Sequence, residues 1–313
     1  MILLTGGAGF IGSNILFTLN QKGMSDILVT DNLRNASKHL NLNNCRFRDY
    51  MDKDDLLAEL PKLGQVEMVI HQGACSSTTE SDGRYMMANN YTYSKTLLHY
   101  CIDRKIPFIY ASSAATYGDG KKGFDDRHDN YFPLNVYGYS KLLFDRYVRQ
   151  MIEKKQISIP VAGLRYFNVY GYQENHKGDM ASVIYKMFLQ VSEGRPITLF
   201  EGSDEIYRDF IFVEDVVNTV LYFTEKQKGQ GIYNCGTGKE RSFGDMARIF
   251  MQLDKNASLN TIPFPEHLKG KYQYFTRAET EALREAGYEQ PFTSLEDGIK
   301  KYYELLTASN GYR

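Results

Sequence analysis

Short apolar runs alternate with amphipathic stretches through the first half of the chain. The runs that we predict to be strands lie at residues 2–5, 26–31, 45–49, 66–72, 107–113 and 159–167. Stretches with helical spacing lie between them, near residues 12–22, 53–60, 84–104 and 138–154. Strands that are apolar at consecutive positions are typical of a parallel sheet that helices cover on both faces. The pattern therefore predicts an α/β protein with a doubly wound parallel sheet.

The rhythm changes after residue 170. Residues 197–200, 208–213 and 231–238 are predicted to be short strands, and helical patterns occupy residues 177–191, 242–253, 276–286 and 294–307. We therefore expect a nucleotide-binding domain at residues 1–170 with a return segment near 208–240. A smaller α/β substrate domain is expected at residues 171–313.

Composition and charge exclude several classes of function. The chain has 42% hydrophobic and 24% charged residues, and its net charge of −1 offers no basis for binding nucleic acid or an anionic membrane. No apolar run approaches the roughly 20 residues of a membrane span, and no signal peptide is evident. We expect a cytoplasmic protein without a metal, since no zinc spacing fits the cysteines at positions 45, 75, 101 and 235.

A glycine-rich turn joins the first strand to the first helix. In "LLTGGAGFIGSNI", Gly6, Gly9 and Gly12 follow the spacing that dinucleotide-binding turns use. Such glycines allow a tight turn, close approach of a diphosphate and close packing of helix on strand. The helix N-terminus then presents free N–H groups to the phosphates. This context predicts a nucleotide site.

The end of the second strand bears on the choice between NAD and NADP. Asp31 stands where a carboxylate usually accepts the ribose hydroxyls of NAD. Arg34 and Lys38 follow closely and could neutralise the 2′-phosphate of NADP, although both could also be solvated loop cations. We favour NADP over NAD.

A tyrosine four residues before a lysine occurs four times, as Tyr91/Lys95, Tyr117/Lys121, Tyr137/Lys141 and Tyr222/Lys226. On a helix this spacing places both side chains on one face. Only Tyr137 opens a helix beside the carboxyl end of a predicted central strand, where Ser112 and Ser113 supply hydroxyls. Position therefore favours Tyr137 and Lys141 as the chemical pair.

The glycine turn, "SSAATYG" (112–118), "YGYSK" (137–141) and "RYFNVYG" (165–171) together resemble the extended short-chain dehydrogenase/reductase family, which has a Rossmann fold. The resemblance implies that Tyr137 is the general acid/base and that Ser113 hydrogen-bonds the reacting oxygen. It also implies that Lys141 lowers the pKa of Tyr137 from its usual value near 10 while holding the nicotinamide ribose.

Longer segments resemble the ADP-L-glycero-D-manno-heptose 6-epimerase branch of that family. They include "HQGACSSTTE" (71–80), "NHKGDMASV" (175–183), "LFEGSDEIYRDFIFVEDV" (199–216) and "IPFPEHLKGKYQYFT" (262–276). The resemblance implies an ADP-heptose substrate destined for the lipopolysaccharide inner core, tightly bound NADP and a homo-oligomer, a pentamer in that branch. Carbon 6 would be oxidised to a ketone and then reduced on its other face.

The same resemblance implies individual site residues. Tyr137 and Lys177 would be the two acid/base groups. The cofactor would contact Phe10, Ile11, Asp31, Asn32, Lys38, Lys53, Gln72, Gly73, Ala74, Cys75, Ser76, Asn89, Lys141, Val169 and Lys177, beside the glycine turn. The substrate would contact Ser113, Asn168, Asp179, Lys186, Phe200, Glu201, Gly202, Ser203, Arg208 and Tyr272.

Several positions leave alternatives open. Gln72, Asp179 and Lys186 stand where that branch is expected to have Glu, Ser and His, which affects details of recognition. On sequence alone, Lys53 could be a helix-start cation and Lys177 a solvated charge. The rival functions are a UDP-hexose 4-epimerase, a nucleotide-sugar dehydratase and a non-catalytic NADP sensor. Ala114 and Ala115 argue against a dehydratase, which would place an Asp–Glu pair there.

Overall fold

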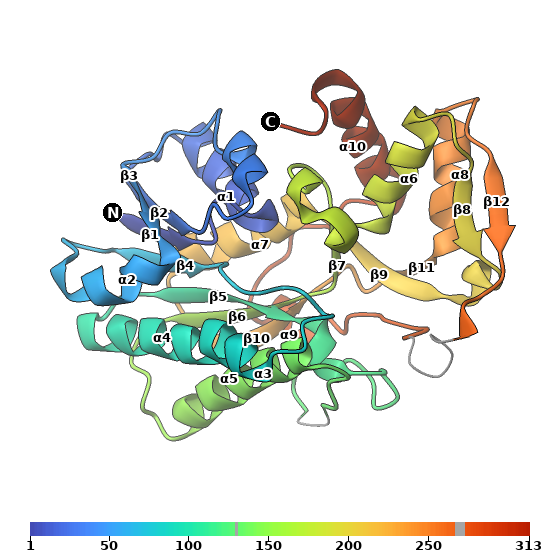
Figure 1. Cartoon of the computed structure of the whole chain (residues 1–313). Coiled ribbons are helices and arrows are strands. Elements are labelled where there is room, and N and C mark those ends of the chain that lie inside the picture. Colours follow the sequence, from blue (N-terminus) through green and yellow to red (C-terminus); the bar gives the residue numbers. More distant parts are fainter. Residues whose placement is uncertain (129–130, 267–272) are drawn as a thin grey trace.

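A seven-stranded parallel sheet forms the centre of the computed structural model, which describes residues 1–128, 131–266 and 273–313 (Figure 1). The strand order is β10-β6-β5-β4-β1-β2-β3. The strands are β1 (Ile2–Thr5), β2 (Ile27–Asp31), β3 (Asp49–Asp52), β4 (Met68–His71), β5 (Phe108–Ser113), β6 (Val161–Tyr166) and β10 (Gln230–Cys235). The strand order reverses between β1 and β4: β2 and β3 follow on one side of β1, and β4, β5 and β6 follow on its other side. The predicted doubly wound parallel sheet is confirmed.

Helices cover both faces of this sheet, because its strands are apolar at consecutive positions. Leu4 of β1 packs in a cluster with α1 (Phe10–Gln21) and α7 (Val213–Lys226), and Leu3 packs in another with α4 (Tyr93–Arg104) and α5 (Val136–Glu153). Figure 1 shows these two pairs on opposite faces. The shorter helices are α2 (Lys53–Glu59) and α3 (Gly83–Met86), and a π-helical segment, Met87–Thr92, joins α3 to α4. No helix of the described ranges has the length and apolar content of a membrane span.

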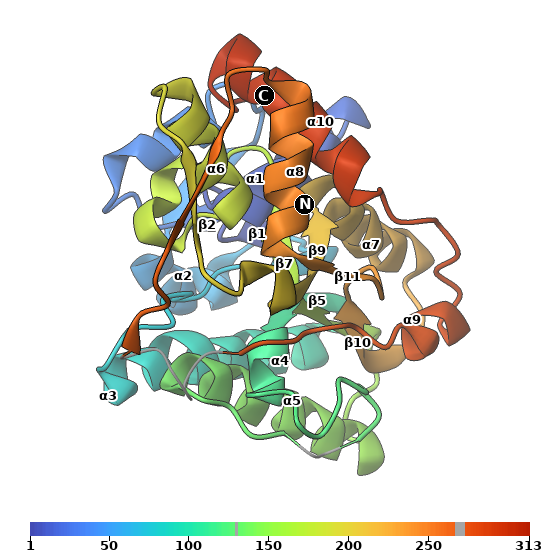
Figure 2. The ribbon, with the colours of Figure 1, turned by 90° about the vertical axis from the view of Figure 1, so that its right-hand side faces the viewer.

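The second half of the chain builds two small sheets beside the first. One contains β7 (Asn168–Tyr170), β9 (Tyr207–Phe212) and β11 (Glu240–Ser242), and the other pairs β8 (Ile197–Phe200) with β12 (Leu259–Ile262). The helices here are α6 (Val183–Ser192), α8 (Phe243–Leu253), α9 (Glu281–Glu285) and α10 (Leu295–Ser309). Figure 2 shows α6, α8 and α10 packed together, and their apolar side chains share one buried cluster.

Some predicted boundaries are wrong. The third strand begins at Asp49, where the prediction ended, because the edge strand β3 is only partly buried. A 3₁₀ turn occupies Asn175–Met180, so the helix predicted at residues 177–191 begins only at Val183. Helix α7 was not predicted, since β9 runs into it at Phe212 without a side-chain cap. Of the helix predicted at residues 276–286, only α9 (Glu281–Glu285) forms.

Candidate active site

A cavity of about 510 Å³ opens at the carboxyl ends of β1, β2, β4 and β5. This is the position where the strand order reverses, and open α/β sheets bind ligands there. Every residue that the family resemblance assigned to the cofactor lines this cavity. The remaining lining residues include Ser113 and Tyr137, so the structure brings the predicted cofactor residues and the chemical pair together.

The glycine turn is shaped as a cradle for phosphate. Gly6 has φ of +70°, and a Cβ there would lie 2.6 Å from the Gly73 backbone nitrogen. A Cβ on Gly12 would lie 2.1 Å from the Gly6 carbonyl oxygen. Helix α1 begins after Gly9 with no side-chain cap and no acidic residue in its first turn. Its N–H groups and positive dipole end are therefore available to an anion.

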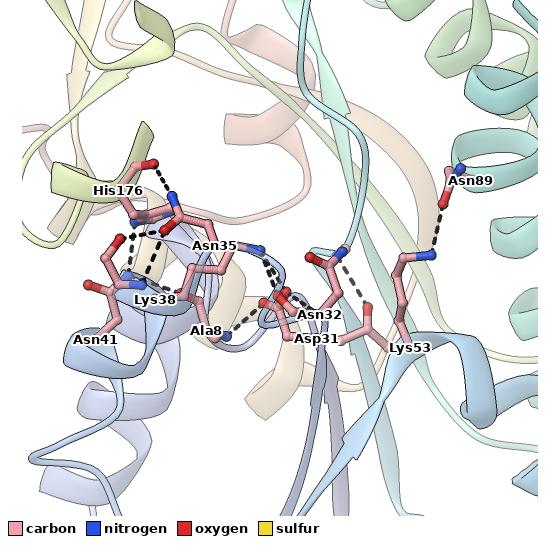
Figure 3. A network of polar contacts seen from close by, with 12 residues as sticks. Ala8, Asp31, Asn32, Asn35, Lys38, Asn41, Lys53, Asn89 and His176 are labelled. Carbon is pink, nitrogen blue, oxygen red and sulfur yellow. Dashed lines mark hydrogen bonds and ion pairs between the residues drawn. The ribbon is translucent and has the colours of Figure 1, made fainter. Parts of the chain in front are cut away.

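Asp31 organises the end of the cavity where the sequence predicts the adenosine ribose. Its buried carboxylate accepts hydrogen bonds from the backbone N–H groups of Ala8, at 2.9 Å, and Asn32, at 2.7 Å, and pairs with the Lys38 ammonium at 2.9 Å (Figure 3). Lys53 donates to Asn89 Oδ1 at 3.0 Å nearby. The cradle and this carboxylate fit a nicotinamide dinucleotide.

Arg34, the second predicted phosphate cation, lies elsewhere. Its side chain is 70% exposed, and the guanidinium pairs with Asp54 at 3.6 Å, outside the lining of the cavity. Lys38 is therefore the cation of this loop that faces the ribose end.

Ser113, Tyr137 and Lys141 meet where β5 ends and α5 begins. The Asn135 side chain caps α5 by accepting from the Gly138 N–H at 2.9 Å, which fixes the first turn and Tyr137 with it. One turn later, the buried Lys141 ammonium donates to the Ala111 carbonyl at 2.8 Å. Burial lowers the pKa of Lys141 to about 8.

Burial and the hydrogen bond with Ser113 have opposite effects on the acidity of Tyr137. Burial raises the pKa of its hydroxyl, and the hydrogen bond with Ser113 offsets only part of that effect. The lower pKa expected from the sequence depends on the Lys141 ammonium and an oxidised nicotinamide together, and it stays a prediction.

The other three tyrosines of the repeated pattern lie outside the cavity lining, and all three belong to the described ranges. Tyr91 packs edge-on against Tyr147. The buried Tyr117 hydroxyl donates to Asn234 Oδ1 at 2.6 Å, and Tyr222 donates to the Ala286 carbonyl at 2.7 Å. These three have structural partners instead of a place in the cavity.

Lys177 enters the cavity from the 3₁₀ turn between β7 and α6. Its ammonium lies 5.1 Å from the centre of the Phe10 ring. Burial lowers the pKa of Lys177, against the opposing effect of the Glu174 carboxylate. The neighbouring His176 also lines the cavity, and burial together with Lys38 and Lys177 lowers the pKa of His176 to about 4.

Most of the predicted substrate residues lie outside the lining of this cavity. They are Asn168, Asp179, Lys186, Phe200, Glu201, Gly202, Ser203 and Arg208, on β7, the turn before α6, α6 itself and the β8–β9 region. Lys186 donates to the Asp179 carbonyl at 2.7 Å, and the buried Arg208 stacks 5.8 Å from the Phe243 ring. Tyr272 lies outside the described residues.

The cavity also contains residues that sequence reasoning missed, among them Tyr93, Tyr166 and Met180. Tyr166 donates to Gln72 Oε1 at 3.0 Å, so the amide at position 72 has a partner on the next wall of the cavity. Tyr166 ends strand β6, and its place at the carboxyl end of a parallel strand was a usable signal.

Comparison with known proteins agrees with this geometry. Residues 2–236 match the NAD dependent epimerase/dehydratase family. The chain is 51% identical over 316 residues to an ADP-L-glycero-D-manno-heptose-6-epimerase of Brachyspira hyodysenteriae, covering 100% of this chain and 99% of the relative.

Solved structures give the same picture. The ADP-L-glycero-D-manno-heptose-6-epimerase of Helicobacter pylori is 30% identical, with a TM-score of 0.85, over 98% of this chain and 96% of that one. A UDP-glucose 4-epimerase of Thermotoga maritima is 28% identical, with a TM-score of 0.82, over 99% of both chains. The resemblance read from the sequence is confirmed.

Proposed function

Since this chain belongs to the NAD-dependent epimerase/dehydratase family, we propose that it is an ADP-L-glycero-D-manno-heptose 6-epimerase. It converts ADP-D-glycero-D-manno-heptose into its L-glycero epimer, a precursor of the lipopolysaccharide inner core. The observation that carries the proposal is 51% identity over the whole chain to an enzyme of that name. The shared cavity of Ser113, Tyr137, Lys141 and Lys177 supports it.

The bound nicotinamide cofactor would take a hydride from carbon 6 and return it to the opposite face. The glycine turn and the start of α1 would hold its diphosphate, and Asp31 its adenosine ribose. We favour NADP because Lys38 places a cation beside Asp31, where its ammonium can pair with a 2′-phosphate.

Tyr137 would exchange the proton of the carbon 6 hydroxyl while Ser113 hydrogen-bonds the same oxygen. Burial raises the pKa of the Tyr137 hydroxyl, which favours the protonated form that can donate to that oxygen. To accept a proton it needs positive charge nearby, and the Lys141 ammonium, one turn further along α5, supplies it.

Lys177 would be the second acid/base group. Inversion requires the ketone to present both faces to one fixed hydride donor, so its oxygen need not occupy the same place in the two half-reactions. Tyr137 on α5 and Lys177 on the turn before α6 reach the cavity from different elements. The lowered pKa of Lys177 increases the fraction of neutral amine, which is the form that accepts a proton.

The rest of the substrate would bind between the cavity and the second half of the chain. We assign Asn168, Asp179, Lys186, residues 200–203 and Arg208 to the ADP and sugar groups, and residues 171–313 to the substrate domain. An arginine suits a diphosphate because its guanidinium forks onto two oxygens. We further propose a cytoplasmic homo-oligomer, a pentamer, which analytical ultracentrifugation would test.

The decisive experiment offers the purified protein two nucleotide sugars in parallel. With ADP-D-glycero-D-manno-heptose, NMR should show the signals of the L-glycero epimer growing to equilibrium, while UDP-glucose should stay unchanged. Turnover of UDP-glucose alone would identify a UDP-hexose 4-epimerase instead. Cofactor binding without turnover of either sugar would support a non-catalytic sensor.

A further inference from the structure

Two loops that are far apart in the sequence meet beside the cavity. We call residues 32–41 the ribose loop and residues 173–180 the base loop. Asn35 Nδ2 donates to the His176 carbonyl at 3.0 Å, and Asn41 Nδ2 lies 3.1 Å from His176 Nδ1 (Figure 3). Gln173 Nε2 donates to the Asn41 carbonyl at 3.1 Å. The ribose loop therefore holds the base loop at both Gln173 and His176.

Asn41 fixes the protonation state of His176. Its side chain is 1% exposed, and its Nδ2 also lies 2.9 Å from the Ala8 carbonyl and 3.3 Å from that of Gln173. Because the two carbonyl oxygens can only accept, they fix the orientation of the amide, and its nitrogen cannot accept a proton from His176. The Nδ1 atom of His176 is therefore the unprotonated ring nitrogen. The proton of a neutral His176 is then on Nε2. A pKa lowered to about 4 agrees with a neutral ring.

The base loop depends on such side-chain contacts for its shape. It contains Gln173 with φ of +66° and Gly178 with φ of +53°, and its 3₁₀ geometry is broken at Gly178. The buried Glu174 carboxylate anchors the loop by accepting from the Gly171 N–H at 3.2 Å and the Ser182 hydroxyl at 2.7 Å. His176, which the ribose loop contacts through Asn35 and Asn41, directly precedes Lys177 in the sequence.

We propose that His176 is a positioning residue that ties Lys177 to the ribose loop. An ordered ribose loop then places the Lys177 ammonium against Phe10, so the nucleotide end of the cavity and this proton-transfer group are coupled. The role assigned to Lys177 in catalysis rests on the proposed function, whereas its position does not.

Three variants separate this role from general stability. His176→Leu removes the Nδ1 acceptor and leaves the Asn41 amide facing an apolar group. His176→Asn keeps an acceptor oxygen near the place of Nδ1 and is the matched control. Asn35→Asp, at an exposed position, keeps the oxygen that accepts from the Ser37 N–H but loses the donor to the His176 carbonyl. None of these substitutions adds or removes the Lys177 amine.

The titration of Lys177 tests the position directly. Reductive ¹³C-methylation followed by NMR gives each lysine a signal, and the one missing from Lys177→Arg is that of Lys177. In the unmodified sequence it should titrate below the usual lysine range. In His176→Leu the loop should open to solvent and raise this pKa by about one unit, and Asn35→Asp should raise it by less. His176→Asn should leave it unchanged, and an unchanged titration in His176→Leu would overturn the proposal.

Single turnovers with each epimer then separate the positioning role of His176 from the proposed epimerase function. His176→Leu should slow only the half-reaction that Lys177→Met also slows, roughly tenfold, because the amine of Lys177 is then displaced from its place in the cavity. If the Lys177 titration moves in His176→Leu but neither epimer reacts with the unsubstituted protein, the positioning role stands and the proposed function fails. If both epimers react and His176→Leu changes neither the Lys177 titration nor the rate, the proposed function stands and the positioning role of His176 fails.

Discussion

Tyr137 and Lys177 reach the same cavity from different kinds of structure. Tyr137 lies on the first turn of the 18-residue helix α5, which Asn135 caps and which packs on the central sheet. Lys177 lies on a broken 3₁₀ turn whose shape depends on Asn35, Asn41 and Glu174, each from outside or beside the turn. One group is placed by regular elements and the other by side-chain hydrogen bonds. The first placement should therefore tolerate distant substitutions better than the second.

Tyr137→Phe should have the largest effect. It removes the hydroxyl and leaves α5 intact, so turnover should fall by about 10²–10⁴-fold, the range of a general acid/base contribution. The nucleotide released on denaturation should still be present in normal amount. Initial rates and the nucleotide content of the same preparation measure both effects.

The matched controls are Tyr91→Phe and Tyr222→Phe. Their hydroxyls lie outside the cavity lining, and the Tyr222 hydroxyl donates to the Ala286 carbonyl and accepts from the Lys226 ammonium. Both variants should keep turnover within a few fold. An inactive, folded Tyr91→Phe beside an active Tyr137→Phe would refute the choice of Tyr137 by its position in the fold.

Lys177→Met should have the next largest effect, a loss of cofactor reduction with only one of the two epimers. If Lys177 serves one epimer and Tyr137 the other, absorbance of reduced cofactor should fail to appear in a single turnover with only one of the two epimers. The loss with that epimer should be on the order of 10²-fold. Equal impairment with both epimers, relieved by more substrate, would make Lys177 a binding residue.

Replacing Lys38 should change nucleotide preference more than turnover. Loss of a cation that contacts the 2′-phosphate should weaken NADP roughly tenfold relative to NAD. Arg34→Met serves as the comparison and should leave the ratio unchanged, since Arg34 pairs with Asp54 outside the cavity lining. Calorimetric titration of the cofactor-free protein with each nucleotide measures the ratio. A native protein that releases only NAD on denaturation would contradict the role given to Lys38.

The pH dependence of kcat/KM should show the smallest effect. Burial lowers the pKa of Lys141 to about 8, so its ammonium is present below that pH and is lost as the pH rises through it. Activity that needs this charge should fall severalfold between about pH 7.5 and 8.5. Lys141→Arg should move the alkaline limb upward. A profile flat to pH 10 would show that the cofactor or substrate holds Lys141 protonated.

The sequence predicted the parts of the molecule that regular patterns encode. Strands β1, β4 and β5 are apolar at consecutive positions and were found, whereas β12 is exposed throughout and gives no periodic signal. The edge strand β3 was displaced for the same reason.

The residues of the site also fall into those that local sequence patterns predict and those that they do not. The glycine turn and Tyr137 follow from their places relative to predicted strands and helices. The hydrogen bonds of Asn35 and Asn41 to His176 cross more than a hundred residues, and no local pattern contains them. Only folding brings these residues together.

The late return of the chain to the central sheet has a consequence during synthesis on the ribosome. Strand β6 ends at Tyr166, but its outer neighbour β10 begins only at Gln230. At roughly 5–20 residues per second, the nascent chain carries β6 as an unpaired edge for several seconds. An open edge strand is a template for pairing with other chains. Nascent chains halted between these two strands should therefore be the forms most dependent on chaperones.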